Sequence, residues 1–233
     1  LIQYSDKIEN LFTPYANCDD LISIFSTQFT IETTDTSLLR RITKLLDNKK
    51  CTDSKLFFDA TNRLYDLEPT ASSADKMAKM SIVKGKHSEA IVFAKKAVEM
   101  EQDNDKKAVY LLGLADAQRN SGSYSAARSS VYSALALKAG WGEAYMNLGN
   151  IYVSSASTCG NDFEQKTVYW IAVDAFKKAL ADESSKARAA KSINTYSKYF
   201  PTKENSFFNG VENGKSYTIN CWINKTTIAR TSD

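Results

Sequence analysis

The sequence predicts an all-α protein, a right-handed superhelix of helix-turn-helix repeats that ends in a short C-terminal β-hairpin. The main observation is a set of apolar triplets whose members are spaced by four and then three residues, so that each triplet lies on one face of a helix. The triplets are Ala90/Ala94/Ala97, Ala127/Val131/Ala134 and Ala172/Phe176/Ala179. Hydrophobic residues make up 43% of the chain, with only 9 Gly and 3 Pro, which favours ordered helices over disorder. Stacked helical hairpins of this kind usually bind partners rather than catalyse reactions.

The first helices are expected within residues 1–34, over Tyr4–Phe12 and Cys18–Phe29, as a truncated repeat. The first full repeat pairs Leu38–Asp47 with a helix that Asp53 caps and that runs to Leu67. The Glu68-Pro69 step then closes this second helix.

Further repeats are expected over residues 71–103 and 105–138, and a fourth begins at Glu143. Together the repeats occupy residues 35–183, and the fourth is interrupted by an insertion after Ala156. Gly149 stands inside its first helix, where a glycine costs about 1 kcal/mol relative to alanine. We therefore expect a neighbouring helix to cross closely at Gly149.

The end of the chain changes character. A capping helix is expected over residues 184–200 and a tail with a hairpin over residues 201–233. Alternation predicts strands at Tyr217–Ile223 and Thr226–Arg230 around a tight turn. A two-stranded hairpin is marginal alone in water, so it must pack on the helices.

Residues Glu143–Tyr152, together with Tyr124–Ala134, resemble the tetratricopeptide-repeat (TPR) consensus, and the resemblance extends over residues 38–183. The Cys159-Gly160 step and the Cys221-Trp222-Ile223 tail also look like those of exported, uncharacterised TPR proteins of Bacteroidetes-type bacteria. The TPR resemblance implies a scaffold that binds proteins or peptides in a concave groove. The second resemblance implies a periplasmic or envelope location and no known activity.

Carrying the consensus positions of the TPR family onto this chain gives a candidate peptide-binding set on the concave face. Its members are Asp75 and Lys79, then Leu112, Asp116, Arg119 and Asn120, and finally Met146, Asn147, Asn150 and Ser154. Asparagine can both donate to and accept from a peptide backbone. The alternative is that these residues form an ordinary solvated helix face. Asp116 replaces the amide of the family's carboxylate clamp, so we do not expect recognition of a C-terminal carboxylate.

Four cysteines and one histidine, His87, are present, and no CxxC pair occurs, which argues against a zinc site. Cys18 and Cys51 begin successive back helices, which fall along one edge of a helical stack. Cys159 lies in an insertion on that edge, and the hairpin carries Cys221. We predict the disulfides Cys18–Cys51 and Cys159–Cys221, and with them an oxidising compartment. The alternative is four reduced thiols in a cytoplasmic protein.

Other function classes have little support in the sequence. The net charge of +3 is spread without a basic block, which argues against nucleic acid as a partner. No apolar run approaches the ~20 residues of a membrane span. No hydrolase, kinase or dinucleotide motif occurs, so we expect neither catalytic residues nor a cofactor. Because the chain opens on Leu1 rather than Met, we expect a trimmed or mature fragment.

The leading hypothesis is a non-enzymatic helical-repeat scaffold that binds a protein or peptide partner. The alternative is a surface glycan-binding component, because aromatic side chains can serve as platforms for sugars. The aromatic candidates are Tyr124, Trp141, Tyr169, Trp170 and Trp222. An exposed Trp pair would favour a glycan, whereas a continuous polar concave face would favour a peptide.

Overall fold

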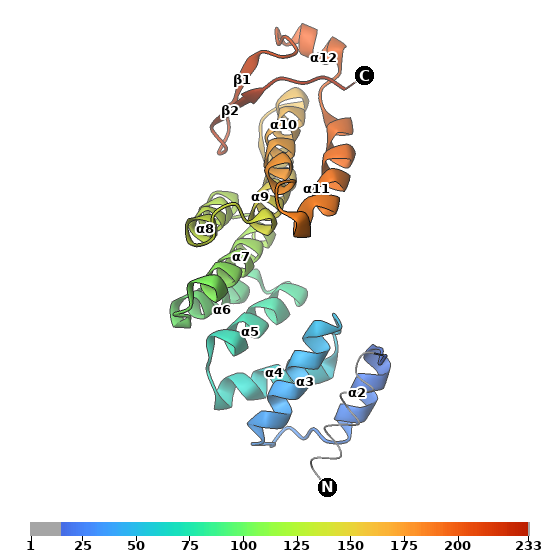
Figure 1. The fold of residues 1–233 in the computed structure, drawn as a ribbon, viewed down its shortest axis with the longest axis vertical. Helices are drawn as coiled ribbons and strands as arrows, with labels where there is room; N and C mark the ends of the chain where they lie inside the picture. Colours follow the sequence, from blue (N-terminus) through green and yellow to red (C-terminus); the bar gives the residue numbers. More distant parts are fainter. Residues whose placement is uncertain (1–14, 233) are drawn as a thin grey trace. The chain divides into compact units, whose positions relative to one another are not determined.

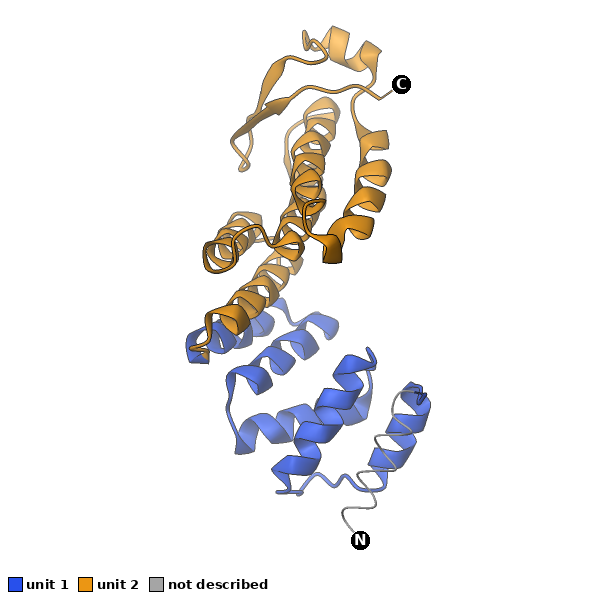
Figure 2. Ribbon diagram, viewed as in Figure 1, with its two compact units in different colours: residues 1–100 blue, residues 101–233 orange. Residues whose placement is uncertain are grey.

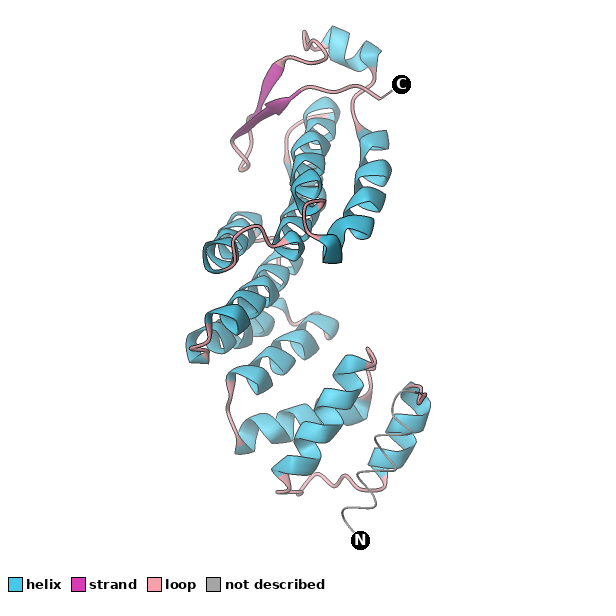
Figure 3. Cartoon of the chain, in the orientation of Figure 1, coloured by secondary structure: helices cyan, strands magenta, loops and turns pink. Residues whose placement is uncertain are grey.

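The computed structural model describes residues 15–232, so the expected helix Tyr4–Phe12 lies outside the described residues. The chain divides into two compact units, residues 1–100 and 101–233, which Figure 2 colours separately. Helices form most of both units, and the strands lie near the C-terminus (Figure 3). We describe each unit by itself.

The described part of unit 1 consists of consecutive helices, each packed against the next. They are α2 (Cys18–Ser26), α3 (Thr36–Asn48), α4 (Lys55–Leu67), α5 (Ala71–Val83) and α6 (His87–Met100). The pairs α3–α4 and α5–α6 are the first two predicted repeats (Figure 1). The α2 helix is shorter than predicted, because it ends at Ser26 instead of Phe29.

Polar caps and an apolar core explain the helices of unit 1. Asp35 accepts a hydrogen bond from the Leu38 N–H at 3.0 Å and so caps α3. The predicted cap at Asp53 is wrong by one residue, since Ser54 Oγ accepts from the Phe57 N–H at 3.2 Å. The core includes the side chains of Phe25, Leu39, Ile42, Leu46 and Phe57, all of which are fully buried.

Unit 2 continues the pattern with longer helices. These are α7 (Asn104–Asn120), α8 (Tyr124–Leu137), α9 (Gly142–Ser155), α10 (Asp162–Ala179) and α11 (Glu183–Tyr196). The α9 helix packs against α7, α8, α10 and α11, and a 3₁₀ turn (Ala156–Thr158) follows it. All three apolar triplets that predicted the repeats are buried, as a stack of closely packed helices requires.

The C-terminal hairpin differs in detail from the prediction. Strands β1 (Ser216–Ile219) and β2 (Lys225–Ile228) pair antiparallel, from Ser216 opposite Ile228 to Ile219 opposite Lys225. The expected strand through Ile223 is wrong, because residues 220–224 form the turn. Pairing stops where Cys221 and Trp222 turn toward the helices instead of toward the other strand. A short helix before the hairpin, α12 (Lys203–Phe208), was also not predicted.

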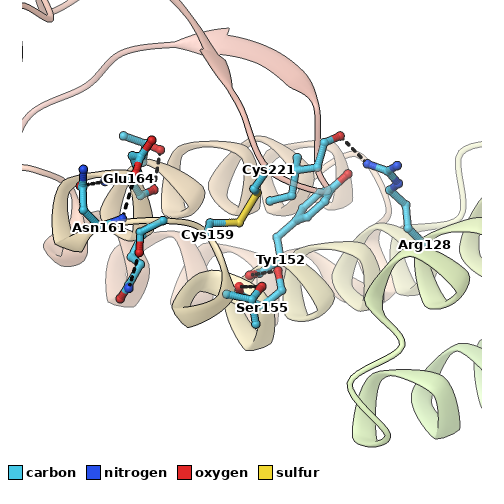
Figure 4. Close-up of a disulfide and its surroundings, with 12 residues drawn as sticks. Arg128, Tyr152, Ser155, Cys159, Asn161, Glu164 and Cys221 are labelled. Atoms are coloured by element: carbon cyan, nitrogen blue, oxygen red, sulfur yellow. Dashed lines mark hydrogen bonds between the residues drawn. A yellow bond between two sulfur atoms is a disulfide. The ribbon is translucent and has the colours of Figure 1, made fainter.

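Side-chain bonds fix the hairpin to the helices of unit 2. Cys221 is joined to Cys159, and the Arg128 guanidinium donates to the Ile223 carbonyl at 2.6 Å (Figure 4). Just after β2, Trp170 Nε1–H donates to the Arg230 carbonyl at 2.7 Å, and Arg230 donates back to the Trp170 carbonyl at 2.7 Å. Packing against the helices thus supplies the stability that a lone hairpin lacks.

The described residues therefore confirm the predicted fold class, a helical-repeat protein with a short C-terminal hairpin. Both disulfides of the structure, Cys18–Cys51 and Cys159–Cys221, are the pairs predicted from the sequence. Within residues 15–232, no helix combines the length and apolarity that crossing a bilayer would need.

Candidate functional site

Eight of the ten predicted peptide-binding residues lie on two neighbouring helices of unit 2. The α7 helix carries Leu112, Asp116, Arg119 and Asn120, and α9 carries Met146, Asn147, Asn150 and Ser154. The other two, Asp75 and Lys79, lie on α5 in unit 1. The site is therefore built here from α7 and α9.

Polar side chains connect α7 to α9. Asp116 Oδ1 accepts from Asn147 Nδ2 at 3.0 Å and from Arg119 Nη2 at 3.3 Å. The Arg119 guanidinium also reaches Ser154 Oγ at 3.4 Å. Tyr124, which starts α8, donates its hydroxyl to the Ser154 carbonyl at 2.9 Å. Four residues of the predicted set thus form one hydrogen-bonded network, and Arg119 also has a structural role in it.

The members of the predicted set differ in how much surface they offer. Leu112 and Met146 are each only 6% exposed, so they belong mainly to the core. Asn120 is exposed, and its Nδ2 donates to the carbonyl of Asp116 in its own helix at 2.8 Å. Asn150 is exposed on α9. The polar members, Asp116, Arg119, Asn120, Asn147, Asn150 and Ser154, are called the α7–α9 face below.

Burial and neighbouring charge have opposite effects on the pKa of the Asp116 carboxyl. Burial between the helices raises the pKa of the Asp116 carboxyl, while the Arg119 guanidinium and the Asn147 amide lower it, and the net direction is upward. The side chain keeps 44% of its surface exposed, so solvent screens much of this effect.

Two buried polar atoms on this face have no hydrogen-bond partner among the described residues. They are the Oδ1 acceptor of Asn147 and the Nε donor of Arg119. A buried donor or acceptor left unsatisfied costs about 1–3 kcal/mol. Both atoms have essentially no accessible surface, so a partner could reach them only if neighbouring side chains moved aside.

An ion pair that the sequence analysis missed extends the polar surface to α11. Arg188 of α11 donates to the carboxylate of Glu143 on α9, with one contact at 3.3 Å and a shorter one. This contact holds the pKa of Arg188 above its usual range. The pair could be found from the sequence only if the register of α11 against α9 were known, because 45 residues separate the partners.

In unit 1, the predicted residues Asp75 and Lys79 pair with each other at 3.1 Å. Lys79 also approaches Asp47 of α3 at 3.5 Å, and Lys76 approaches the same carboxylate at 3.7 Å. Burial alone lowers the pKa of Lys79, but the carboxylates of Asp75 and Asp47 outweigh it and raise that pKa. These two residues thus bond to charges of their own unit.

The aromatic candidates for a sugar platform are mostly occupied by internal contacts. Trp170 is fully buried. The Trp222 ring stacks on Tyr124 with centroids 6.0 Å apart and lies 5.0 Å from the Arg128 guanidinium. Trp141 is half-buried, with the Lys138 ammonium 4.8 Å from its ring centre.

The described residues hold no group of three or more His, Cys, Asp or Glu side chains arranged to bind a metal ion. The chemistry of the α7–α9 face is that of hydrogen-bond donors and acceptors with one carboxylate and one guanidinium. Such a face can bind polar groups of a partner.

Comparisons with known proteins support the fold. A crystal structure of MamA, a TPR-like protein, matches 73% of this chain and 89% of its own chain, with 17% sequence identity and a TM-score of 0.51. A second crystal structure of MamA protein matches 70% and 81% of the two chains, with 22% identity and a TM-score of 0.49. No protein-family model and no curated protein matches the sequence. The likeness therefore concerns the fold, a TPR-like helical repeat.

Proposed function

We propose that this chain is a non-enzymatic scaffold that binds a protein or peptide partner on the α7–α9 face, in the periplasm or cell envelope of a bacterium. Helical-repeat folds present extended surfaces made of successive helices, and these surfaces commonly serve recognition. The TPR-like fold supports a protein partner.

The observation that carries the proposal is the pair of exposed amide side chains on the α7–α9 face, Asn120 of α7 and Asn150 of α9. The two helices that carry them are joined by the Asp116–Asn147 and Arg119–Ser154 hydrogen bonds. An extended polypeptide carries N–H and C=O groups along its backbone and can pair with both the acceptor and the donor of such an amide. Exposed Asn150, one turn from Asn147, enlarges the surface available to such a backbone.

The envelope location rests on the two disulfides. Cys18–Cys51 and Cys159–Cys221 account for all four cysteines of the sequence. Disulfides persist in oxidising compartments and are rare in the cytoplasm. Mass measurement of alkylated, unreduced protein purified from its native host tests this part. Unmodified cysteines are expected, and four alkyl adducts would contradict the envelope location.

Binding is tested with a random-peptide display library selected against the oxidised protein, followed by titration of the selected peptides. Asn150→Lys places a long charged side chain in the α7–α9 face without breaking any hydrogen bond described above. We expect it to weaken binding about tenfold or more, as loss of a central interface contact commonly does.

Ser133→Lys is the matched control, because Ser133 is an exposed position on α8 in the same unit. It adds the same charge away from the α7–α9 face and should leave peptide affinity unchanged. Equal effects of the two variants, or none from either, would place the binding surface elsewhere on the chain.

A further inference from the structure

Two adjacent phenylalanines are displayed in solvent at one end of unit 2. Phe207 is 80% exposed and Phe208 is 75% exposed, and their rings meet edge to face with centroids 5.8 Å apart. Both lie on α12, which Figure 1 shows at the end of unit 2 away from α7. Their exposure stands out, because large aromatic side chains normally contribute to cores and interfaces.

The backbone of α12 is fixed at both ends. Thr202 Oγ1 accepts from the Asn205 N–H at 3.1 Å and caps the start. At the end, the Val211 N–H donates to the Ser206 carbonyl at 2.9 Å and the Gly210 N–H donates to the Phe207 carbonyl at 3.0 Å. This pattern is a Schellman motif, and the positive φ of 67° at Gly210 permits it.

The same short helix is anchored on its inner side. Ser206 is buried, while the two residues that follow it, Phe207 and Phe208, are exposed. The chain just before α12 is tied to the C-terminal segment, because the Ser232 N–H donates to the Pro201 carbonyl and Ser232 Oγ to the Phe200 carbonyl, each at 3.0 Å. The two rings are therefore presented from a defined turn.

The size of this apolar tip limits what can cover it. A phenylalanine buries roughly 150–250 Å² when enclosed, so the two rings expose on the order of 300 Å². A stable protein interface needs roughly 800 Å² from each partner. The tip is thus too small for a second copy of this chain or another protein to hold by itself. A lipid surface requires no complementary partner surface, and shallow insertion of a few apolar side chains gives weak, reversible attachment.

The charges close in sequence suit a lipid surface. On α12 itself, Lys203 and Glu204 balance each other and are both exposed. The segments on either side add the exposed Lys198 and Lys215 against the exposed Glu212, which leaves an excess of one positive charge. Lysine stems can extend toward phosphate groups while neighbouring apolar rings enter the acyl boundary.

We propose that α12 inserts Phe207 and Phe208 into the interfacial layer of a phospholipid membrane and attaches unit 2 to it reversibly. This inference is independent of the partner-binding face proposed above. Attachment through α12 would leave the side chains of the α7–α9 face unchanged.

The test is flotation of the oxidised protein with phosphatidylcholine vesicles, with and without phosphatidylglycerol. Binding to both vesicle types is expected, and it should survive high salt because apolar insertion is not screened. Phe207→Ser and Phe208→Ser should each weaken the partition coefficient about tenfold or more, the loss that follows from exposing one buried phenylalanine.

Tyr15→Ser is the matched control, since Tyr15 is an aromatic residue of unit 1 that is 88% exposed. It should bind vesicles like the wild type. Alkylation and circular dichroism confirm that each variant keeps both disulfides and its helices. Absence of vesicle binding by the wild type, or equal loss in the Tyr15 variant, would overturn the proposal. Self-association that depends on Phe207 and Phe208 without any vesicle binding would show that a second copy covers the tip, and would also overturn it.

Discussion

The close approach of α10 to α9 at Gly149 leads to a prediction whose sign is unusual. In an exposed helix, replacing glycine by alanine stabilises by about 1 kcal/mol, because alanine has the better helix propensity. At Gly149 we expect the opposite. A Cβ atom there would lie 2.3 Å from Cε1, 2.6 Å from Cζ and 2.7 Å from Cδ1 of Phe176.

The surroundings of Phe176 determine whether the ring can move away. Ordinary van der Waals contact begins at 3.4 Å, so the ring would have to shift by about 1 Å. Phe176 is fully buried, and its ring stacks on Tyr196 of α11 with centroids 5.6 Å apart. A shift of the ring therefore disturbs α11 as well as α10.

Two opposing effects determine how much Gly149→Ala changes the free energy of unfolding. Overpacking a filled core costs about 1–3 kcal/mol, and the gain in helix propensity offsets about 1 kcal/mol of it. Because the new Cβ would lie 2.3 Å from a fully buried ring, we expect the overpacking cost to be about 2–3 kcal/mol. Gly149→Ala should thus destabilise the protein by about 1–2 kcal/mol, and Gly149→Leu by more. Urea unfolding followed by circular dichroism measures the difference in the free energy of unfolding.

A double-mutant cycle identifies the contact. Phe176→Leu leaves space near Gly149, so the combined variant should be more stable than the sum of the two single effects, with a coupling of about 1 kcal/mol. Ser133→Ala, at an exposed position of α8, serves as the control for propensity and should stabilise slightly. An unchanged or raised midpoint for Gly149→Ala would refute the assignment of a close crossing.

Three further predictions concern how the parts of unit 2 are joined. Replacing Cys159 and Cys221 by Ser should lower the free energy of unfolding by about 2–4 kcal/mol, since their separation of 62 residues closes a long loop, and an unchanged urea midpoint would contradict this. Arg128→Ala should lower the free energy of unfolding by about 1–2 kcal/mol, because it removes the hydrogen bond to the Ile223 carbonyl and the contact with Trp222. It should also speed amide hydrogen exchange in the hairpin, and unaltered exchange would argue that Arg128 does not hold the hairpin on α8. The Ser184 hydroxyl and the Gly142 and Ser184 N–H groups hold the pKa of Asp182 below its usual range, so its contribution to stability is present above about pH 4 and is lost as the pH falls further. In the Asp182→Asn variant, the free energy of unfolding should therefore fall less steeply at acid pH than in the wild type. The same acid dependence in both proteins would exclude this role of Asp182.

The repeat architecture could be predicted because its signal is local and periodic. Triplets such as Ala127/Val131/Ala134 place apolar groups on one helix face whatever the neighbours are, and all three triplets are buried. The close crossing at Gly149 was also predictable, since an isolated glycine inside a helix needs a packing reason. The cysteine pairing followed from the expectation that back-helix starts share one edge.

Features that depend on tertiary register were missed or misplaced. The Glu143–Arg188 pair requires the packing of α11 on α9, which no local pattern specifies. Alternation continues through Cys221-Trp222-Ile223, yet these residues form the turn because Trp222 packs on Tyr124 and Cys221 bonds to Cys159. Among the predicted binding residues, Leu112 and Met146 were chosen by repeat position, and their burial shows that the position alone does not settle exposure.

The hairpin gives the two sides of unit 2 different roles. Its bonds reach Arg128 of α8 and Trp170 and Asp174 of α10, so it covers part of the back-helix layer. A stack of repeats needs its terminal apolar surface closed, and here the chain closes it with its own C-terminal segment. No bond described for the hairpin involves a side chain of the α7–α9 face. These bonds therefore use none of the polar side chains through which we propose that a partner binds, and the Cys159–Cys221 disulfide holds the hairpin in this arrangement.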